Sequence, residues 1–101
     1  MTFEIRVGRR AVRQIRHAAD WWSENRPKAP GAFGEDIESA FNLLGQLPGA
    51  GERVQHRTIP LVRRLLLSRV RYLLYYSVDE ASSVVEIIAL WHTGRGQPPR
   101  L

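Results

Sequence analysis

The chain lacks several features that would define its environment or chemistry. It contains no cysteine, which excludes disulfide bonds and thiolate metal sites. No apolar run approaches the ~20 residues that a membrane-spanning helix needs. The first ten residues, MTFEIRVGRR, lack the apolar segment of a secretory signal peptide. With 101 residues in all, we expect a single cytoplasmic domain, residues 1–101, with no membrane association.

Motifs of common enzyme classes are also missing. There is no P-loop, no dinucleotide-binding GxGxxG and no GxSxG nucleophile elbow. His17, His56 and His92 fall in different predicted elements, with no carboxylate or second histidine at ligand spacing. We therefore expect no metal and no small-molecule cofactor.

Positive charge is abundant. The chain has fifteen Lys and Arg residues and ten Asp and Glu residues, which gives a net charge of +5. Lys28 is the single lysine. Arginine's planar fork suits bidentate contact with carboxylate or phosphate. The balance points to nucleic acid, a nucleic-acid-handling machine or an acidic protein as a partner. Plain solubility explains the composition equally well.

The C-terminal third is dense in β-branched, aromatic and leucine side chains, which favour strands. It predicts strands over Val62–Leu67, Val70–Val78 and Val84–Trp91, separated by short polar breaks. Connections this short join antiparallel neighbours, because a parallel crossover needs a dozen or more residues. We therefore predict an antiparallel β-meander.

A two-residue turn at Ser68-Arg69 would set the register of the first two strands and place Leu65 opposite Tyr72. The side that carries Leu65 and Tyr72 is mostly apolar and is expected to take the helices. On the other side, the arginines Arg64 and Arg71 would lie among hydrophobic neighbours and beside Tyr75. A longer turn is expected to shift the register and exchange the two faces.

The N-terminal part alternates between strand and helix patterns. Thr2–Val7 predicts a half-buried strand, and a helix begins at Arg9 and ends at Asn25–Pro30. A second helix ends at Pro48–Gly51, and Arg53–Ile59 is either a short edge strand or an extended loop. The first helix carries an apolar stripe of Val12, Ile15, Ala19 and Trp22. The fold class is α+β: an N-terminal strand, an antiparallel helical hairpin packed on one sheet face, the meander, and a loose tail over residues 92–101.

The first helix also carries a cationic cluster that includes Arg9, Arg13 and Arg16. Cations in a first turn oppose the helix dipole, so the cluster is either solvated surface or a contact for an acidic partner. Trp21 lies beside the apolar stripe and is expected to be partly exposed, as an interface anchor.

One catalytic hypothesis remains, an RNA-cleaving site on the sheet. Such a site needs a base, an acid and cations at the phosphate. Arg64, Arg71, Tyr75 and His92 are the candidates. The alternative is that the tyrosine packs and the arginine stems cover apolar neighbours.

Three segments together resemble the RelE/ParE superfamily of type II toxins over nearly the whole chain. They are DWWSENRP at the end of the first helix, LLGQLPGAGERV at the end of the second, and the meander RRLLLSRVRYLLYYSVDEASSVVEIIALWHTGR. Residues that fall on the superfamily's strand pattern are Tyr76, Val78, Val85, Glu86, Ile87, His92 and Arg95. The resemblance implies a RelE/ParE-like fold.

The resemblance implies one of two activities: inhibition of DNA gyrase without cleavage in ParE-like members, or ribosome-dependent mRNA cleavage in RelE-like members. Leu73 stands where some nucleases have an arginine, the tail lacks their tyrosine-rich ending, and His92 with Arg95 is closer to the ParE type. The ParE-like branch is therefore favoured, with no catalysis of its own, and the mRNA endonuclease is the alternative. The implied partners are gyrase, or the ribosome in the alternative, and a cognate ParD/RelB-like antitoxin. The residues expected to bind the target are Arg64, Arg71, His92 and Arg95, and those expected to bind the antitoxin are Arg9, Arg13, Arg16 and Trp21.

Overall fold

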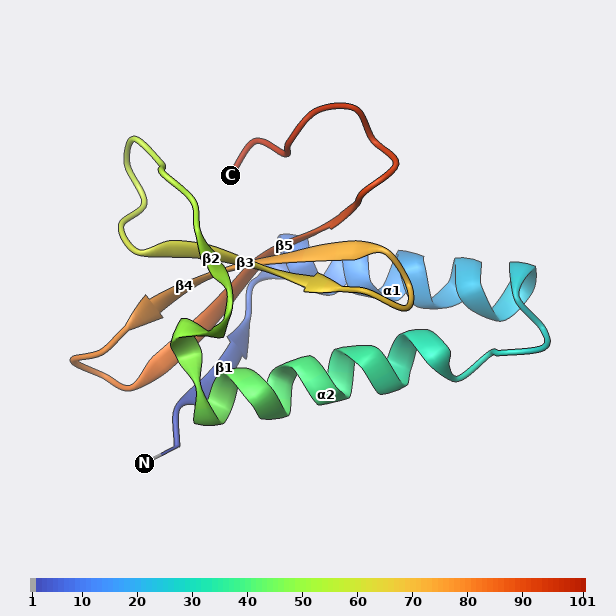
Figure 1. Ribbon diagram of the computed structural model, residues 1–101, viewed down its shortest axis with the longest axis horizontal. Helices are drawn as coiled ribbons and strands as arrows, with labels where there is room; N and C mark the ends of the chain where they lie inside the picture. The colour runs from blue at the N-terminus through green and yellow to red at the C-terminus, as the bar shows by residue number, and fades with distance from the viewer. Residues whose placement is uncertain (1) are drawn as a thin grey trace.

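A computed structural model describes residues 2–101 as two helices packed on one side of a five-stranded sheet (Figure 1). The α+β prediction is confirmed. Within these residues, no helix has the length and apolarity needed to cross a membrane. In chain order the elements are β1 (Glu4–Val7), α1 (Arg9–Asn25), α2 (Ala32–Gln46), the 3-10 turn η1 (Pro48–Ala50), β2 (Glu52–Arg53), β3 (Val62–Leu67), β4 (Tyr72–Asp79) and β5 (Val84–His92).

The strands lie in the order β1-β5-β4-β3-β2. β3, β4 and β5 form the predicted antiparallel meander, and β1 closes the other edge by pairing in parallel with Val84–Ile87 of β5. Of the predicted edge segment, only Arg53 belongs to a strand, and β2 pairs with Arg63 and Arg64 alone. Residues 54–61 are an irregular loop, as the second alternative expected.

The turn between β3 and β4 is longer than predicted, because it contains four residues, Ser68 to Arg71. The predicted pairing of Leu65 with Tyr72 is therefore wrong, and Leu65 lies opposite Leu74. Arg71 adopts a left-handed φ of 65° and donates its N–H to the Leu67 carbonyl over 2.8 Å. A shift of two residues keeps each side chain on its original face, because strand side chains alternate with a period of two. The expected exchange of faces does not occur, but Arg71 leaves the strand.

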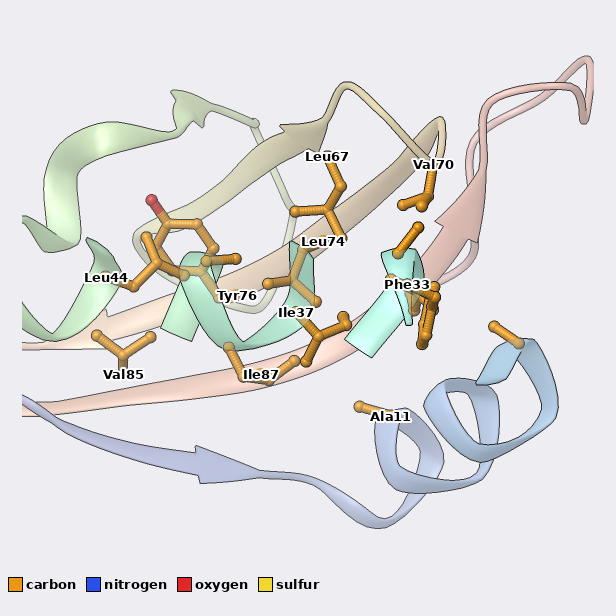
Figure 2. Close-up of a cluster of buried hydrophobic side chains, with 14 residues drawn as sticks. Ala11, Phe33, Ile37, Leu44, Leu67, Val70, Leu74, Tyr76, Val85 and Ile87 are labelled. Atoms are coloured by element: carbon orange, nitrogen blue, oxygen red, sulfur yellow. The ribbon is translucent and has the colours of Figure 1, made fainter. Parts of the chain in front are cut away.

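The main core lies between the helices and one face of the sheet (Figure 2). This confirms the prediction that the helices pack on one sheet face, the face that carries Leu74 and Tyr76. α2 contributes Phe33, Ile37 and Leu44, which follow the helical repeat of one buried stripe. Other members are Ala11, Ala18, Ala32, Ala40, Leu67, Val70, Val85, Ile87 and Leu90.

α1 faces the core with Ile15 and Trp22 of the predicted stripe, together with two alanines outside it. Ala11 and Ala18 are buried and Ile15 and Trp22 half-buried, whereas Ala19 is exposed. Because the alanine side chains are small, α1 can pack closely against the sheet. It lies beside the part of β5 that does not pair with β1. There the Gln14 side-chain oxygen accepts the backbone N–H of Leu90 over 2.9 Å.

The opposite face of the sheet carries a smaller cluster, centred on Val62, Tyr75 and Ala89. It is covered by side chains of the 54–61 loop and by Leu101. The residues after β5 form neither helix nor strand, and this tail passes on the side of the sheet away from α2 (Figure 1). Its predicted first residue, His92, is the last residue of β5. Arg10 of α1 donates a hydrogen bond to the Arg100 carbonyl near the end of the tail.

Candidate functional site

A groove of about 620 Å³ lies between α1 and the C-terminal end of β5. We call it the α1–β5 groove. Its basic lining residues are Arg13, His17, His92 and Arg95, and its aromatic and aliphatic ones are Ala18, Trp21, Tyr72, Leu90 and Trp91. Gln14 and Gly94 complete the lining, so no acidic side chain takes part.

The helix forms one wall with a single line of side chains. Arg13, His17 and Trp21 are spaced four residues apart, which places them on one face of α1 over about 12 Å. Trp21 is 41% exposed, as predicted from its place beside the stripe. The Arg26 guanidinium lies 5.2 Å from the Trp21 ring, which braces the indole from the side of the helix end.

The strand end forms the other wall around His92. Its ring packs edge-on against Tyr72, the residue opposite on β4, with 5.0 Å between centroids. The Gly94 backbone N–H donates to His92 Nδ1 over 2.9 Å, which leaves Nε2 as the nitrogen free to meet a ligand. Burial raises the pKa of the Tyr72 hydroxyl, which therefore stays protonated to higher pH.

Arg95 is held at the rim of the groove by a stacking contact. Its guanidinium lies 4.4 Å from the ring centroid of Trp91, whose indole N–H donates to the Gln97 carbonyl over 2.8 Å. Within the described residues 2–101, the ion pairs formed by arginine belong to Arg6, Arg64 and Arg69. The guanidinium groups of Arg13 and Arg95, both in the groove, are therefore not paired with any carboxylate of these residues.

Two of the other predicted functional residues, Arg64 and Tyr75, lie across the sheet from the groove. Arg64 forms a salt bridge with Glu52, and its guanidinium lies 3.5 Å from the Tyr75 hydroxyl. The contacts with Tyr75 and Glu52 raise the pKa of Arg64. Tyr75 is 2% exposed and belongs to the second cluster, so its ring is chiefly packing.

The four catalytic candidates are thus not assembled in one place. Arg64 and Tyr75 pair on one face, whereas His92 lines the groove on the helix face. Arg71 is exposed in the β3–β4 turn, where its carbonyl accepts the Thr93 N–H over 3.0 Å. In the part of the chain that the structure describes, no group of three His, Asp or Glu side chains is placed to hold a metal ion.

The expected antitoxin contacts are also divided. Arg13 and Trp21 line the groove, together with His92 and Arg95, which the sequence had assigned to the target. Two other residues of the expected antitoxin set, Arg9 and Arg16, are exposed on α1 outside the groove. The sequence analysis did not predict His17 as a residue of this surface, although it lies four residues from both Arg13 and Trp21 and so shares their face of the helix. Tyr72 and Trp91 gave no comparable signal.

A match to a model of a known protein family identifies the family of this chain. The family model for the ParE toxin of the type II toxin–antitoxin system parDE matches residues 5–96. The chain belongs to the ParE toxin family. It is therefore a type II toxin of the RelE/ParE superfamily, as the three sequence segments implied. The match spans α1, the groove and all of the sheet except Glu4.

Solved structures show the same fold for this ParE-family toxin. A chain of the chromosomal ParDE system from P. aeruginosa superposes with a TM-score of 0.66 at 18% identity, covering 90% of this chain and 96% of that one. One from the RelBE2 toxin–antitoxin complex of Mycobacterium tuberculosis gives 0.63 at 20%, covering 91% and 99%. A mutant of E. coli toxin RelE in the free state gives 0.59 at 17%, covering 95% and 88%. No curated protein sequence matches the toxin.

Proposed function

We propose that this toxin inhibits DNA gyrase through protein–protein contact, without cleaving a substrate itself, and that it acts in the cytoplasm. The family match supports the ParE branch. The observation that carries the proposal is the separation of Tyr75 and Arg64 from His92 by the thickness of the sheet.

Cleavage of RNA needs a base, an acid and a cation around one phosphate. Tyr75 is buried and Arg64 is already engaged by Glu52, so neither is free to serve a phosphate near His92. A surface that only binds another protein does not need a base, an acid and a cation around one phosphate. Arg71, His92 and Arg95 lie around the same end of the sheet, and we propose them as target contacts. We also propose Arg64 as a target contact, at the rim of the opposite face.

A cognate antitoxin completes the proposal. The M. tuberculosis neighbour was solved as a toxin–antitoxin complex, and another similar fold comes from an archaeal RelE–RelB complex. We propose that this toxin also binds an antitoxin and that the antitoxin neutralises it. Arg9, Arg13, Arg16 and Trp21 of α1 are the proposed contacts, since the net charge of +5 favours an acidic partner.

Two assays with the purified toxin test the target. In the first, gyrase supercoils a relaxed plasmid with and without the toxin, and cleaved DNA complexes are trapped with detergent and protease. We expect supercoiling to fall and linear DNA to accumulate. In the second, the toxin is added to ribosomes translating a defined message, which we expect to stay intact. Message cut only on ribosomes, with supercoiling unaffected, would replace gyrase with the mRNA-endonuclease alternative.

A further inference from the structure

Arginine occupies a backbone position in the β3–β4 turn where glycine or asparagine would be under less strain. Among residues 2–101, the non-glycine residues with a positive φ are Leu61, Arg71 and Ser83, and none of the glycines has one. At a φ of 65°, Arg71 lies in the left-handed region, where the Cβ of an ordinary residue comes too close to the following carbonyl oxygen. Its side chain is exposed, and its guanidinium has no ion-pair or hydrogen-bond partner among the described residues. Folding alone therefore does not account for an arginine here.

The surroundings impose this conformation on Arg71. Its N–H donates to the Leu67 carbonyl over 2.8 Å, and its carbonyl accepts the Thr93 N–H over 3.0 Å, so the backbone is fixed on both sides. The preceding residue, Val70, is 2% exposed and belongs to the main core (Figure 2). Strained residues persist only where the surrounding structure over-determines them, and they cluster at functional sites. The turn therefore holds the backbone of one exposed, unpaired cation in a fixed place.

Arg69, two residues earlier, ties the same turn to the start of α2. Its guanidinium reaches three acceptors, which are the Ala32 carbonyl at 3.0 Å, the Glu35 carboxylate at 3.0 Å and the Asp36 carboxylate at 2.9 Å. The Arg69 side chain is 53% exposed, so these ion pairs contribute little to the stability of the fold. Their effect on geometry is larger, because a planar guanidinium bound to three acceptors leaves its own backbone little freedom.

We propose that Arg69 is a positioning residue, which ties the turn to α2 and thereby presents the Arg71 guanidinium to an anionic group of the target. The inference rests on the target half of the proposed function, in which Arg71 is a contact, and it does not depend on the antitoxin. Two properties follow from it. Arginine at position 71 lowers the stability of the fold, and Arg69 affects activity only through Arg71.

Arg71→Asn tests the first property, because asparagine adopts the left-handed conformation more readily than arginine. The midpoint of thermal unfolding should rise by about 2–5 °C, while the toxin concentration for half-maximal effect should rise about tenfold. This concentration is measured in whichever of the two assays above the wild-type toxin acts, gyrase supercoiling or message cleavage on ribosomes. Leu61→Asn is the matched control, since it relieves the same strain at the opposite end of β3 and should leave the concentration unchanged.

Arg69→Ala tests the second property. The concentration for half-maximal effect should rise about fivefold, and the backbone N–H of Arg71 should exchange with solvent about tenfold faster. The midpoint of unfolding should fall by less than about 5 °C. Arg6→Ala removes another exposed ion pair, the one with Glu4 on β1, and should change the concentration less than about twofold.

The double variant Arg69→Ala/Arg71→Asn separates positioning from an independent contact. If Arg69 acts through Arg71, the concentration for half-maximal effect should match that of Arg71→Asn alone, about tenfold above wild type. Two independent contributions would instead multiply to about fiftyfold.

The inference would be overturned by an unchanged concentration or a lower unfolding midpoint in Arg71→Asn. It would also be overturned by full activity in Arg69→Ala despite a faster-exchanging Arg71 N–H, or by a multiplied effect in the double variant. Failure of the gyrase assay is a separate result. A toxin that cleaves message on ribosomes and follows the expected pattern keeps the role of Arg69 and loses the proposed target. A toxin inactive in both assays loses both, because Arg71 then has no target to contact.

Discussion

The backbone N–H of Gly51 donates a hydrogen bond to the hydroxyl oxygen of Tyr76 over 2.8 Å, which joins the turn after α2 to the centre of the sheet. The same hydroxyl donates to the Pro48 carbonyl, also over 2.8 Å. Tyr76 is 0% exposed and Gly51 is buried, so the bond between them is shielded from water. The turn that ends α2 is therefore attached to the sheet at both of its ends, Pro48 and Gly51.

Tyr76→Phe should lower the free energy of unfolding by about 1–3 kcal/mol, because it leaves the Gly51 N–H and the Pro48 carbonyl without their partner. Urea unfolding followed by circular dichroism measures the change. Tyr75→Phe is the matched control on the neighbouring residue. Its hydroxyl contact is with Arg64 at 3.5 Å, a weak bond, so we expect a loss below about 1 kcal/mol. Equal losses in the two variants would show that the shared hydroxyl does not hold the turn.

Gly51→Ala should destabilise the toxin by more than about 2 kcal/mol. A Cβ at this position would lie 2.5 Å from the Arg64 carbonyl oxygen and 2.7 Å from the Tyr76 hydroxyl, so the backbone or the ring must move. Gly34→Ala is the opposite case, since a Cβ on this exposed helical residue meets nothing within 4 Å. It should raise stability by about 0.5–1 kcal/mol through helix propensity. Thermal unfolding of both variants checks the predicted difference in sign.

The toxin should lose stability at alkaline pH. Burial raises the pKa of both Tyr76 and Tyr72 in the folded state, so the folded chain keeps those protons when the unfolded chain has released them. The resulting stability is fully present below the unfolded pKa of about 10 and is lost as pH rises through the folded pKa. Urea unfolding between pH 8 and 11 measures the slope. Tyr76→Phe should flatten it, and an unchanged slope in that variant would remove Tyr76 as the cause.

The strands of the meander could be predicted because their side chains carry the signal locally. Val62–Leu67 was predicted with its observed ends, since its β-branched and leucine residues are bounded by polar ones. The register could not be predicted, because the turn is held by contacts distant in sequence. Arg69 forms ion pairs with Glu35 and Asp36, and Val70 is buried among core residues at 2% exposure.

Four residues of the groove could be singled out from sequence, but not their common location. Arg13 and Trp21 suggested one partner, and His92 with Arg95 suggested another. They meet because β1 pairs only with the first part of β5, which lets α1 lie beside the rest. The position of α1 beside β5 therefore depends on where β1 ends in the sheet, and no local sequence pattern predicts that position.

Gly94→Ala should disable the groove without unfolding the toxin. A Cβ at Gly94 would lie 2.8 Å from Nδ1 of His92 and 3.0 Å from its Cε1, inside van der Waals contact. The imidazole must therefore turn away, which breaks its hydrogen bond from Gly94 and its edge-on contact with Tyr72. Because His92 is a proposed target contact, the toxin concentration that half-inhibits gyrase supercoiling should rise about tenfold, equivalent to ~1.4 kcal/mol.

Gly96→Ala is the control for this change, because a Cβ there meets nothing within 4 Å and the residue lies in the same exposed segment. It should leave both gyrase inhibition and the His92 ring resonances in NMR spectra unchanged, whereas Gly94→Ala should shift those resonances. If Gly94→Ala moves the resonances but leaves gyrase inhibition unchanged, His92 does not contact the target. If the two variants behave alike, the close approach of Gly94 to the imidazole has no part in binding.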